Sequence, residues 1–92
     1  MMSSLPIDIK KVRPAEIDRE ILRAGIIAEL DAISLYEQLA GMARTPLIKK
    51  VLADIAREEK THVGEFQTLL LRLDKEQTRE LAKGKKEVDE MG

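Results

Sequence analysis

The chain has 92 residues, enough for one small domain, and its 16 basic and 17 acidic side chains nearly cancel. This balance provides no net field that would attract nucleic acid or an anionic membrane surface. The absence of cysteine excludes disulfides, thiolate metal sites and redox thiols.

The hydrophobic content favours association over a large core within one chain. Tyr36 and Phe66 are the only aromatic residues, so the chain has little bulk to bury and a partner chain is expected. No segment approaches the ~20 apolar residues of a membrane span. Residues 1–10 lack the apolar run of a signal peptide, so we expect a cytoplasmic protein.

The first two-thirds of the chain is typical of a helical hairpin. Residues 1–13 show no sustained periodicity and are predicted to form an N-terminal arm, after which Pro14 suits the first turn of a helix. A break follows, in which Thr45 is a suitable N-cap and Pro46 the first residue of a second helix. This second helix is predicted to end near Leu73. Two long helices joined by a short turn indicate an antiparallel hairpin.

The remaining residues predict a short third helix. Asp74, followed three residues later by Gln77, resembles a capping box that opens it. We expect Gly84 to end this helix, so that residues 14–83 form the folded domain and residues 84–92 a charged tail or linker.

Two polar residues interrupt the apolar seam of the second helix. Its positions follow the alternating spacing of four and three residues that is typical of a helix packed on other helices. The seam is formed by Ile48, Leu52, Ile55, Glu59, His62, Phe66, Leu69 and Leu73. Burying a carboxylate or an imidazole is costly unless the group is paired, hydrogen-bonded or bound to metal. Glu59 and His62 therefore need a specific role.

The first helix offers a third such side chain at the same height. Glu29 falls on its apolar seam, 15.5 residues before a turn centred near residue 44.5, and the midpoint of Glu59 and His62 lies 16 residues after that point. Both separations correspond to ~23 Å along antiparallel helices. The three side chains are therefore expected to converge at one level of an apolar interface.

One hairpin supplies too few ligands to enclose two metal ions, but two hairpins related by a two-fold axis supply four carboxylates and two imidazoles. A Glu from each of two helices, with Glu-x-x-His from each of the other two, is the di-iron ligand set of ferritin-like four-helix bundles. Oxygen ligands with few imidazoles suit iron or manganese better than structural zinc. Alternatively, the three polar residues form a buried hydrogen-bonded network that fixes the register of the helices.

Two runs of residues carry a resemblance to a known family: Glu-Leu-Asp-Ala-Ile-Ser-Leu-Tyr at 29–36 and Arg-Glu-Glu-Lys-Thr-His at 57–62. They resemble the encapsulated ferritins, which are joined to, or encoded with, encapsulin shells in archaea and bacteria. The resemblance covers about residues 15–75. It implies an all-α fold, a hairpin plus a short C-terminal helix, that dimerises into a ferritin-like four-helix bundle and assembles further into a ring-shaped decamer.

The resemblance also implies a function and roles for individual residues. It implies oxidation of Fe(II) with O₂ at a centre of two iron ions per dimer interface, feeding iron storage inside an encapsulin nanocompartment. By position, Glu29 and His62 would be terminal ligands and Glu59 a bridging one. Tyr36 matches a tyrosine near the metals, or is a core aromatic. Asp31 matches an acidic position on the route by which metal reaches the centre.

Two other functions are kept as alternatives. A rubrerythrin-like peroxidase would use the same ligands, but such proteins usually carry an electron-transfer iron site with CxxC pairs, and this chain has no cysteine. The second alternative is a helical assembly or cargo module without catalysis, in which the polar residues of the seam only fix specificity.

Overall fold

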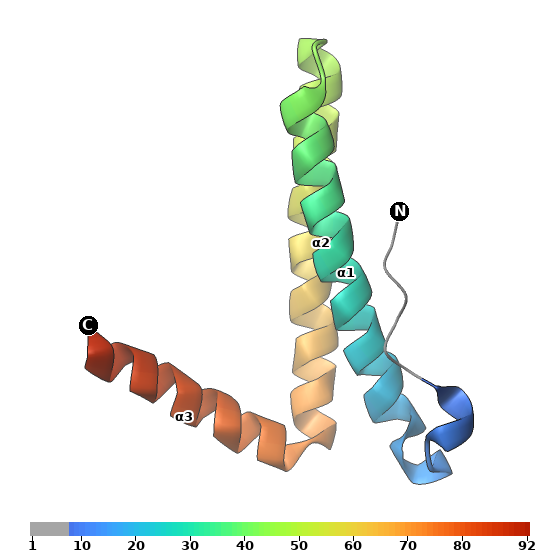
Figure 1. Cartoon of the computed structure of the whole chain (residues 1–92), viewed down its shortest axis with the longest axis vertical. Coiled ribbons are helices and arrows are strands. Elements are labelled where there is room, and N and C mark those ends of the chain that lie inside the picture. Colours follow the sequence, from blue (N-terminus) through green and yellow to red (C-terminus); the bar gives the residue numbers. More distant parts are fainter. Residues whose placement is uncertain (1–7) are drawn as a thin grey trace.

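The computed structural model describes residues 8–92 and is helical (Figure 1). Helix α1 spans Ile17–Met42 and helix α2 spans Pro46–Leu73, and they form an antiparallel hairpin. Helix α3, Lys75–Met91, projects away from the open end of the hairpin. Short 3-10 helices at Ile9–Lys11 (η1) and Pro14–Glu16 (η2) precede α1.

No strand occurs in the described residues, which confirms the expected all-α fold. Among residues 8–92, no helix is long and apolar enough to cross a membrane. The predicted N-terminal arm lies partly outside the described residues, and its described part contains η1. Pro14 does open a helical turn, although this turn is η2 rather than the first turn of α1.

Local signals at the turn define both ends of the hairpin connection. Pro46 is the first residue of α2, as predicted, and Thr45 occupies the N-cap position, although its side chain makes no capping hydrogen bond. Lys49 then reaches back across the turn, where its Nζ donates to the backbone carbonyls of Ala40 at 3.0 Å and Gly41 at 3.3 Å. These bonds satisfy two of the carbonyls that the end of α1 leaves without helical partners.

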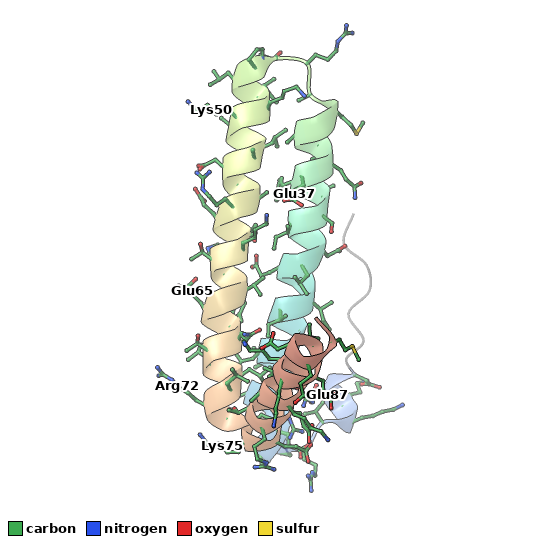
Figure 2. All side chains as sticks on the ribbon, turned by 90° about the vertical axis from the view of Figure 1, so that its left-hand side faces the viewer. Glu37, Lys50, Glu65, Arg72, Lys75 and Glu87 are labelled. Atoms are coloured by element: carbon green, nitrogen blue, oxygen red, sulfur yellow. The ribbon has the colours of Figure 1, made fainter. Side chains whose placement is uncertain are left out.

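The hairpin buries one face of α2 and leaves its neighbouring face open. The side chains that become buried are Leu22, Ile33, Ala56 and Leu70. Other positions of the α2 seam remain about half-exposed: Ile48 at 51 %, Leu69 at 47 % and Leu73 at 57 %. Charged side chains such as Lys50 and Glu65 line the outer edge of α2 (Figure 2). The second apolar face of the hairpin therefore has no cover within the described chain.

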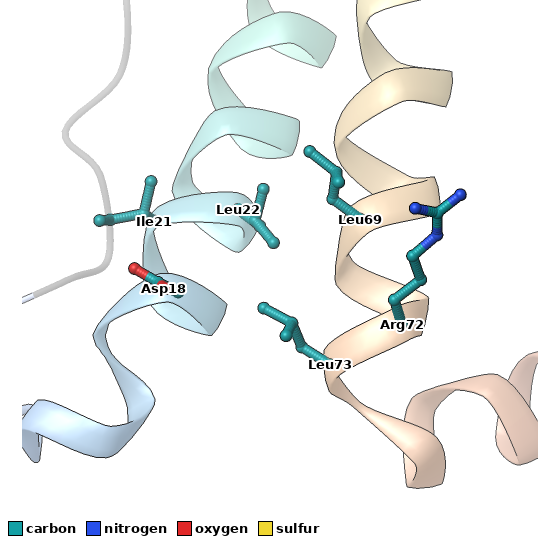
Figure 3. A pocket seen from close by; sticks show the side chains of 6 residues that line it. All are labelled: Asp18, Ile21, Leu22, Leu69, Arg72 and Leu73. Carbon is teal, nitrogen blue, oxygen red and sulfur yellow. The ribbon is translucent and has the colours of Figure 1, made fainter.

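Part of the uncovered apolar face lies at the open end of the hairpin. There Leu22 on α1 and Leu69 and Leu73 on α2 point toward a shared groove of about 340 Å³ (Figure 3). Asp18 and Arg72 also line the groove.

Helix α3 extends beyond its predicted end. The expectation that Gly84 would stop it was wrong, because the helix continues to Met91 and includes most of the segment predicted as a tail or linker. A glycine inside a helix costs only about 1 kcal/mol relative to alanine. The surrounding residues favour helix, and Lys85 and Asp89 form an ion pair of 2.6 Å across one turn. The division into arm, domain and tail stays a prediction.

Asp74 fixes the start of α3. Its Oδ1 accepts the backbone N–H of Gln77 at 2.9 Å, as the capping pattern predicts, and its Oδ2 lies 3.0 Å from Nη2 of Arg23 on α1. The Gln77 amide, and to a smaller extent the Arg23 charge, hold the pKa of Asp74 below its ordinary value. Arg23 thereby links the direction of α3 to α1.

The ionised form of Asp74 is expected to stabilise the fold at neutral pH. Because its pKa is lowered in the folded state, this contribution is complete above the ordinary value of about 3.9 and is lost as the pH falls through the lowered value. Asp74→Asn keeps a capping side chain but does not titrate. Thermal unfolding followed by circular dichroism from neutral pH to about pH 2.5 should show a smaller acid-induced loss of stability in Asp74→Asn than in wild type. Parallel profiles would contradict this role.

Candidate metal centre

Helices α1 and α2 bring together the three side chains that the sequence singled out. Nδ1 of His62 lies 3.6 Å from Oε2 of Glu29 and 3.6 Å from Oε2 of Glu59. One ligand atom from each residue lies within 4.8 Å of the other two. The predicted convergence at one level of the hairpin is thus observed, while the assignment of these residues as metal ligands stays a prediction.

The two carboxylates are mostly buried and have little charge compensation. Glu29 and Glu59 each expose 19 % of their side chains, whereas His62 exposes 45 %. Within the described part of the chain, neither carboxylate forms an ion pair with a lysine or arginine. The nearby Lys60 pairs instead with Glu37, at 2.9 Å across the two helices. The site therefore has an excess of negative charge in a partly desolvated position.

Glu29 has an unsatisfied buried oxygen. Its Oε2 has no hydrogen-bond partner, because the 3.6 Å separation from His62 Nδ1 is longer than a hydrogen bond. The alternative of a hydrogen-bonded network linking these residues therefore lacks its bonds to His62 within one chain. A cation would satisfy the free oxygen and the excess charge together.

The donor set and its spacing fit a metal ion. Ligand atoms about 2.0–2.2 Å from a common ion lie roughly 3–4 Å from one another, and the 3.6 Å separations fall in that range. Carboxylate oxygens with one imidazole nitrogen suit iron or manganese. The residues present therefore fit the iron that the resemblance implies.

A cavity of about 230 Å³ adjoins the two carboxylates. Glu29 and Glu59 line it, and so do Asp31 and Tyr36, the residues expected on the metal route and near the metals. Ala28 lines it as well. The structure thus places Asp31 and Tyr36 beside the candidate centre, and their roles stay predictions.

Sequence reasoning did not single out Gly25, where an added Cβ would meet the ring of Phe66 one turn from the ligands. The signal was present: Gly25 precedes Glu29 by four residues on the same helix face, in a stretch that otherwise favours helix.

Comparison with known proteins identifies the family. The sequence pattern of the family described as Rubrerythrin matches residues 20–91. The chain belongs to the rubrerythrin family. This family lies within the ferritin-like superfamily, whose members are typically di-iron oxidoreductases. The match extends over α3, including the residues after Gly84.

Two curated proteins are similar to the chain in sequence. A ferritin-like-encapsulin shell fusion protein of Pyrococcus furiosus is 52 % identical over 93 residues, covering 99 % of this chain but 27 % of the relative. The encapsulin nanocompartment cargo protein EncC of Myxococcus xanthus is 38 % identical over 68 residues, covering 74 % of this chain and 52 % of the relative. The chain thus spans about a quarter and about half of the length of these relatives.

A solved structure confirms the encapsulated-ferritin resemblance. The crystal structure of the encapsulated ferritin domain from Pyrococcus furiosus matches with a TM-score of 0.82 and 50 % identity, covering 95 % of this chain and 94 % of that one. At this identity and coverage, the ferritin-like fold of this rubrerythrin-family chain is established.

Proposed function

We propose that this chain is a ferroxidase subunit, which oxidises Fe(II) with O₂ at a di-iron centre shared between two copies. The observation that carries the proposal is the convergence of Glu29, Glu59 and His62, with an unsatisfied buried oxygen on Glu29. Membership of a family that usually binds iron supports iron as the metal.

The number of ligands supports a shared centre. One chain contributes two carboxylates and one imidazole, and a second copy doubles this set to the complement of ferritin-like di-iron bundles. The half-exposed positions Ile48, Leu69 and Leu73 lie on the same seam of α2 as Glu59 and His62. A second hairpin packed on this seam would cover them and complete the centre at once.

The order of residues along α2 supports a two-fold axis through the centre. The seam positions are symmetric about the point between residues 60 and 61, so an antiparallel copy of α2 would match apolar positions with apolar ones. Glu59 would then face the partner's His62. The pairs in this register are Ile48 with Leu73, Leu52 with Leu69, Ile55 with Phe66, and Glu59 with His62. Such self-complementarity is what a two-fold interface requires.

Within this centre the chain's groups bind and hold the substrate Fe(II). Glu29 and His62 would hold iron from different helices, and Glu59 would bridge the two iron positions. Each of the two Fe(II) ions would give one electron, and these two electrons with two protons from solvent would reduce O₂ to hydrogen peroxide. The carboxylates would offset the charge that iron gains when it becomes Fe(III).

The relatives suggest where this reaction takes place. One relative is named as a fusion with an encapsulin shell and the other as an encapsulin nanocompartment cargo protein. We place this chain inside an encapsulin compartment of the cytoplasm, with the shell protein as its partner. Its dimers would assemble into a ring-shaped decamer. An open ring has no closed cavity, so iron storage would use the shell.

A rubrerythrin-like peroxidase is the second candidate, because the matching family is described as Rubrerythrin. Its oxidant distinguishes it: the anaerobic protein loaded with Fe(II) is mixed with either O₂ or hydrogen peroxide, and formation of Fe(III) is followed by absorbance. We expect two iron ions per dimer and rapid oxidation by O₂. Oxidation by peroxide alone would identify the peroxidase, and a protein that binds no Fe(II) would be the non-catalytic module.

A further inference from the structure

Gly25 and Phe66 meet one helical turn from the candidate ligands. Gly25 precedes Glu29 by four residues on α1, and Phe66 follows His62 by four residues on α2. The antiparallel hairpin therefore sets both at one level, ~6 Å along the helices from the ligands. A Cβ atom at residue 25 would lie 3.3 Å from Cδ2 and Cε2 of Phe66 and 3.4 Å from its Cζ. The edge of the Phe66 ring is therefore a few tenths of an ångström too close for a side chain at residue 25, because carbon atoms normally pack about 3.5–4.0 Å apart.

Backbone conformation does not explain this glycine. Within residues 8–92, positive φ occurs only at Gly92, so Gly25 has a backbone that any residue can adopt. Glycine is also a poor helix former. By contrast, Gly64 on α2 has nothing within 4 Å of the place where a Cβ would lie. Contact with Phe66 is the feature that separates Gly25 from Gly64.

In the proposed dimer, the partner chain covers the face of the Phe66 ring that points away from Gly25. Phe66 is half-buried in one chain, and the two-fold register places it opposite the partner's Ile55. The ring would then lie between the α1 backbone of its own chain and a partner side chain. A methyl group at residue 25 requires a shift of a few tenths of an ångström. In the proposed interface, with neighbours on both faces of the Phe66 side chain, that shift would be shared between the side chain and the helices.

We propose that Gly25 is a positioning residue of the metal centre: it lets α1 approach Phe66 and so sets the separation of Glu29 from His62. This inference rests on the proposed function, because it assumes that these residues bind metal. The closest ligand atoms of Glu29 and His62 are 3.6 Å apart, and a metal site needs its ligands held within about 0.5 Å of their productive positions, so a shift of a few tenths of an ångström uses a large part of that tolerance. A change in helix spacing one turn away therefore alters coordination without removing a ligand.

Cobalt(II) is a suitable probe, because its visible spectrum reports coordination geometry without any oxidation step. We expect Gly25→Ala to weaken Co(II) binding about 10-fold or more and to change the visible spectrum. Phe66→Leu removes the ring atoms that would touch the new methyl group. The double variant Gly25→Ala/Phe66→Leu should therefore recover the wild-type spectrum and most of the affinity, which is a specific coupling between the two positions.

Gly64→Ala is the matched control and should leave both readouts unchanged, since its Cβ would meet open space. Wild-type Co(II) affinity and spectrum in Gly25→Ala would overturn the inference, even if the variant unfolds at a lower temperature. If Gly25→Ala fails to associate, the double variant decides: a wild-type spectrum supports the inference, and an altered spectrum or a failure to associate overturns it. If the wild-type protein binds Co(II) but does not oxidise Fe(II), the proposed ferroxidase function is wrong while the inference about Gly25 stands.

Discussion

Replacing Glu29 with glutamine is expected to slow the rapid oxidation of Fe(II) by at least about 100-fold while the helices persist. Glutamine keeps the size of the side chain but removes its charge, and the oxygen without a hydrogen-bond partner is the one assigned to metal. Glu59→Gln and His62→Ala should give similar losses, because each ligand of a two-metal site is needed for its geometry. Stopped-flow absorbance of Fe(III) measures the rate, and circular dichroism checks the fold.

Glu58→Gln is the matched control, because it makes the same chemical change at the residue before Glu59. Glu58 is exposed and lies outside the three-residue cluster. Its replacement should leave the oxidation rate unchanged. Wild-type rates in Glu29→Gln, or equal losses in Glu58→Gln, would remove the assignment of Glu29 as a ligand.

The hairpin could be predicted because its signals are local. Helix α2 begins at Pro46 and ends at Leu73, as the proline and the aspartate cap at Asp74 indicate. The level of Glu29 relative to His62 follows from residue counts alone, since helix rise is constant and the turn is short. Sequence periodicity and residue counts are therefore enough to predict that the three side chains lie at one level of the hairpin, as observed.

The features that the sequence did not predict, or predicted wrongly, depend on how residues act together in the folded chain. The direction of α3 involves the ion pair between Arg23 and Asp74, 51 residues apart, and no sequence pattern encodes that pairing. Gly84 predicts a helix end because glycine is common just beyond helices, but the small cost of glycine within a helix is outweighed by the neighbouring residues that favour helix. The role of Gly25 depends on how closely α1 approaches α2, which periodicity does not give.

Association of the chain is expected to depend on metal. Without it, the interface would bring four mostly buried carboxylates together without lysine or arginine partners. Because only the associated state contains the complete site, Fe(II) should pull the equilibrium toward it. At a free concentration 100 times the dissociation constant, one bound ion shifts the equilibrium about 100-fold. Molar mass in solution, measured anaerobically with chelator and with excess Fe(II), tests this.

The variant Glu29→Leu/Glu59→Leu separates the metal from the interface. Leucine continues the apolar seam, so the double variant should associate more strongly than wild type in chelator and should not oxidise Fe(II). If chelated wild type is as fully associated as the metal-loaded form, and the double variant associates less than either, these carboxylates are structural. The ferroxidase proposal would then lose its physical basis.

The interface that metal is expected to stabilise can be identified with a pair of introduced cysteines, because these 92 residues contain none. Ile48→Cys and Leu73→Cys in one chain lie ~37 Å apart along α2, too far for a short bismaleimide to join them. In the proposed antiparallel register, each instead lies beside the other residue of the partner. Metal-loaded protein should therefore form covalent dimers with the reagent, and chelated protein should form far fewer. Each single variant should remain uncross-linked, since it would present only one cysteine at each end of the interface. Efficient cross-linking of either single variant would show that the hairpins associate in another register, in which Glu59 does not meet the partner's His62.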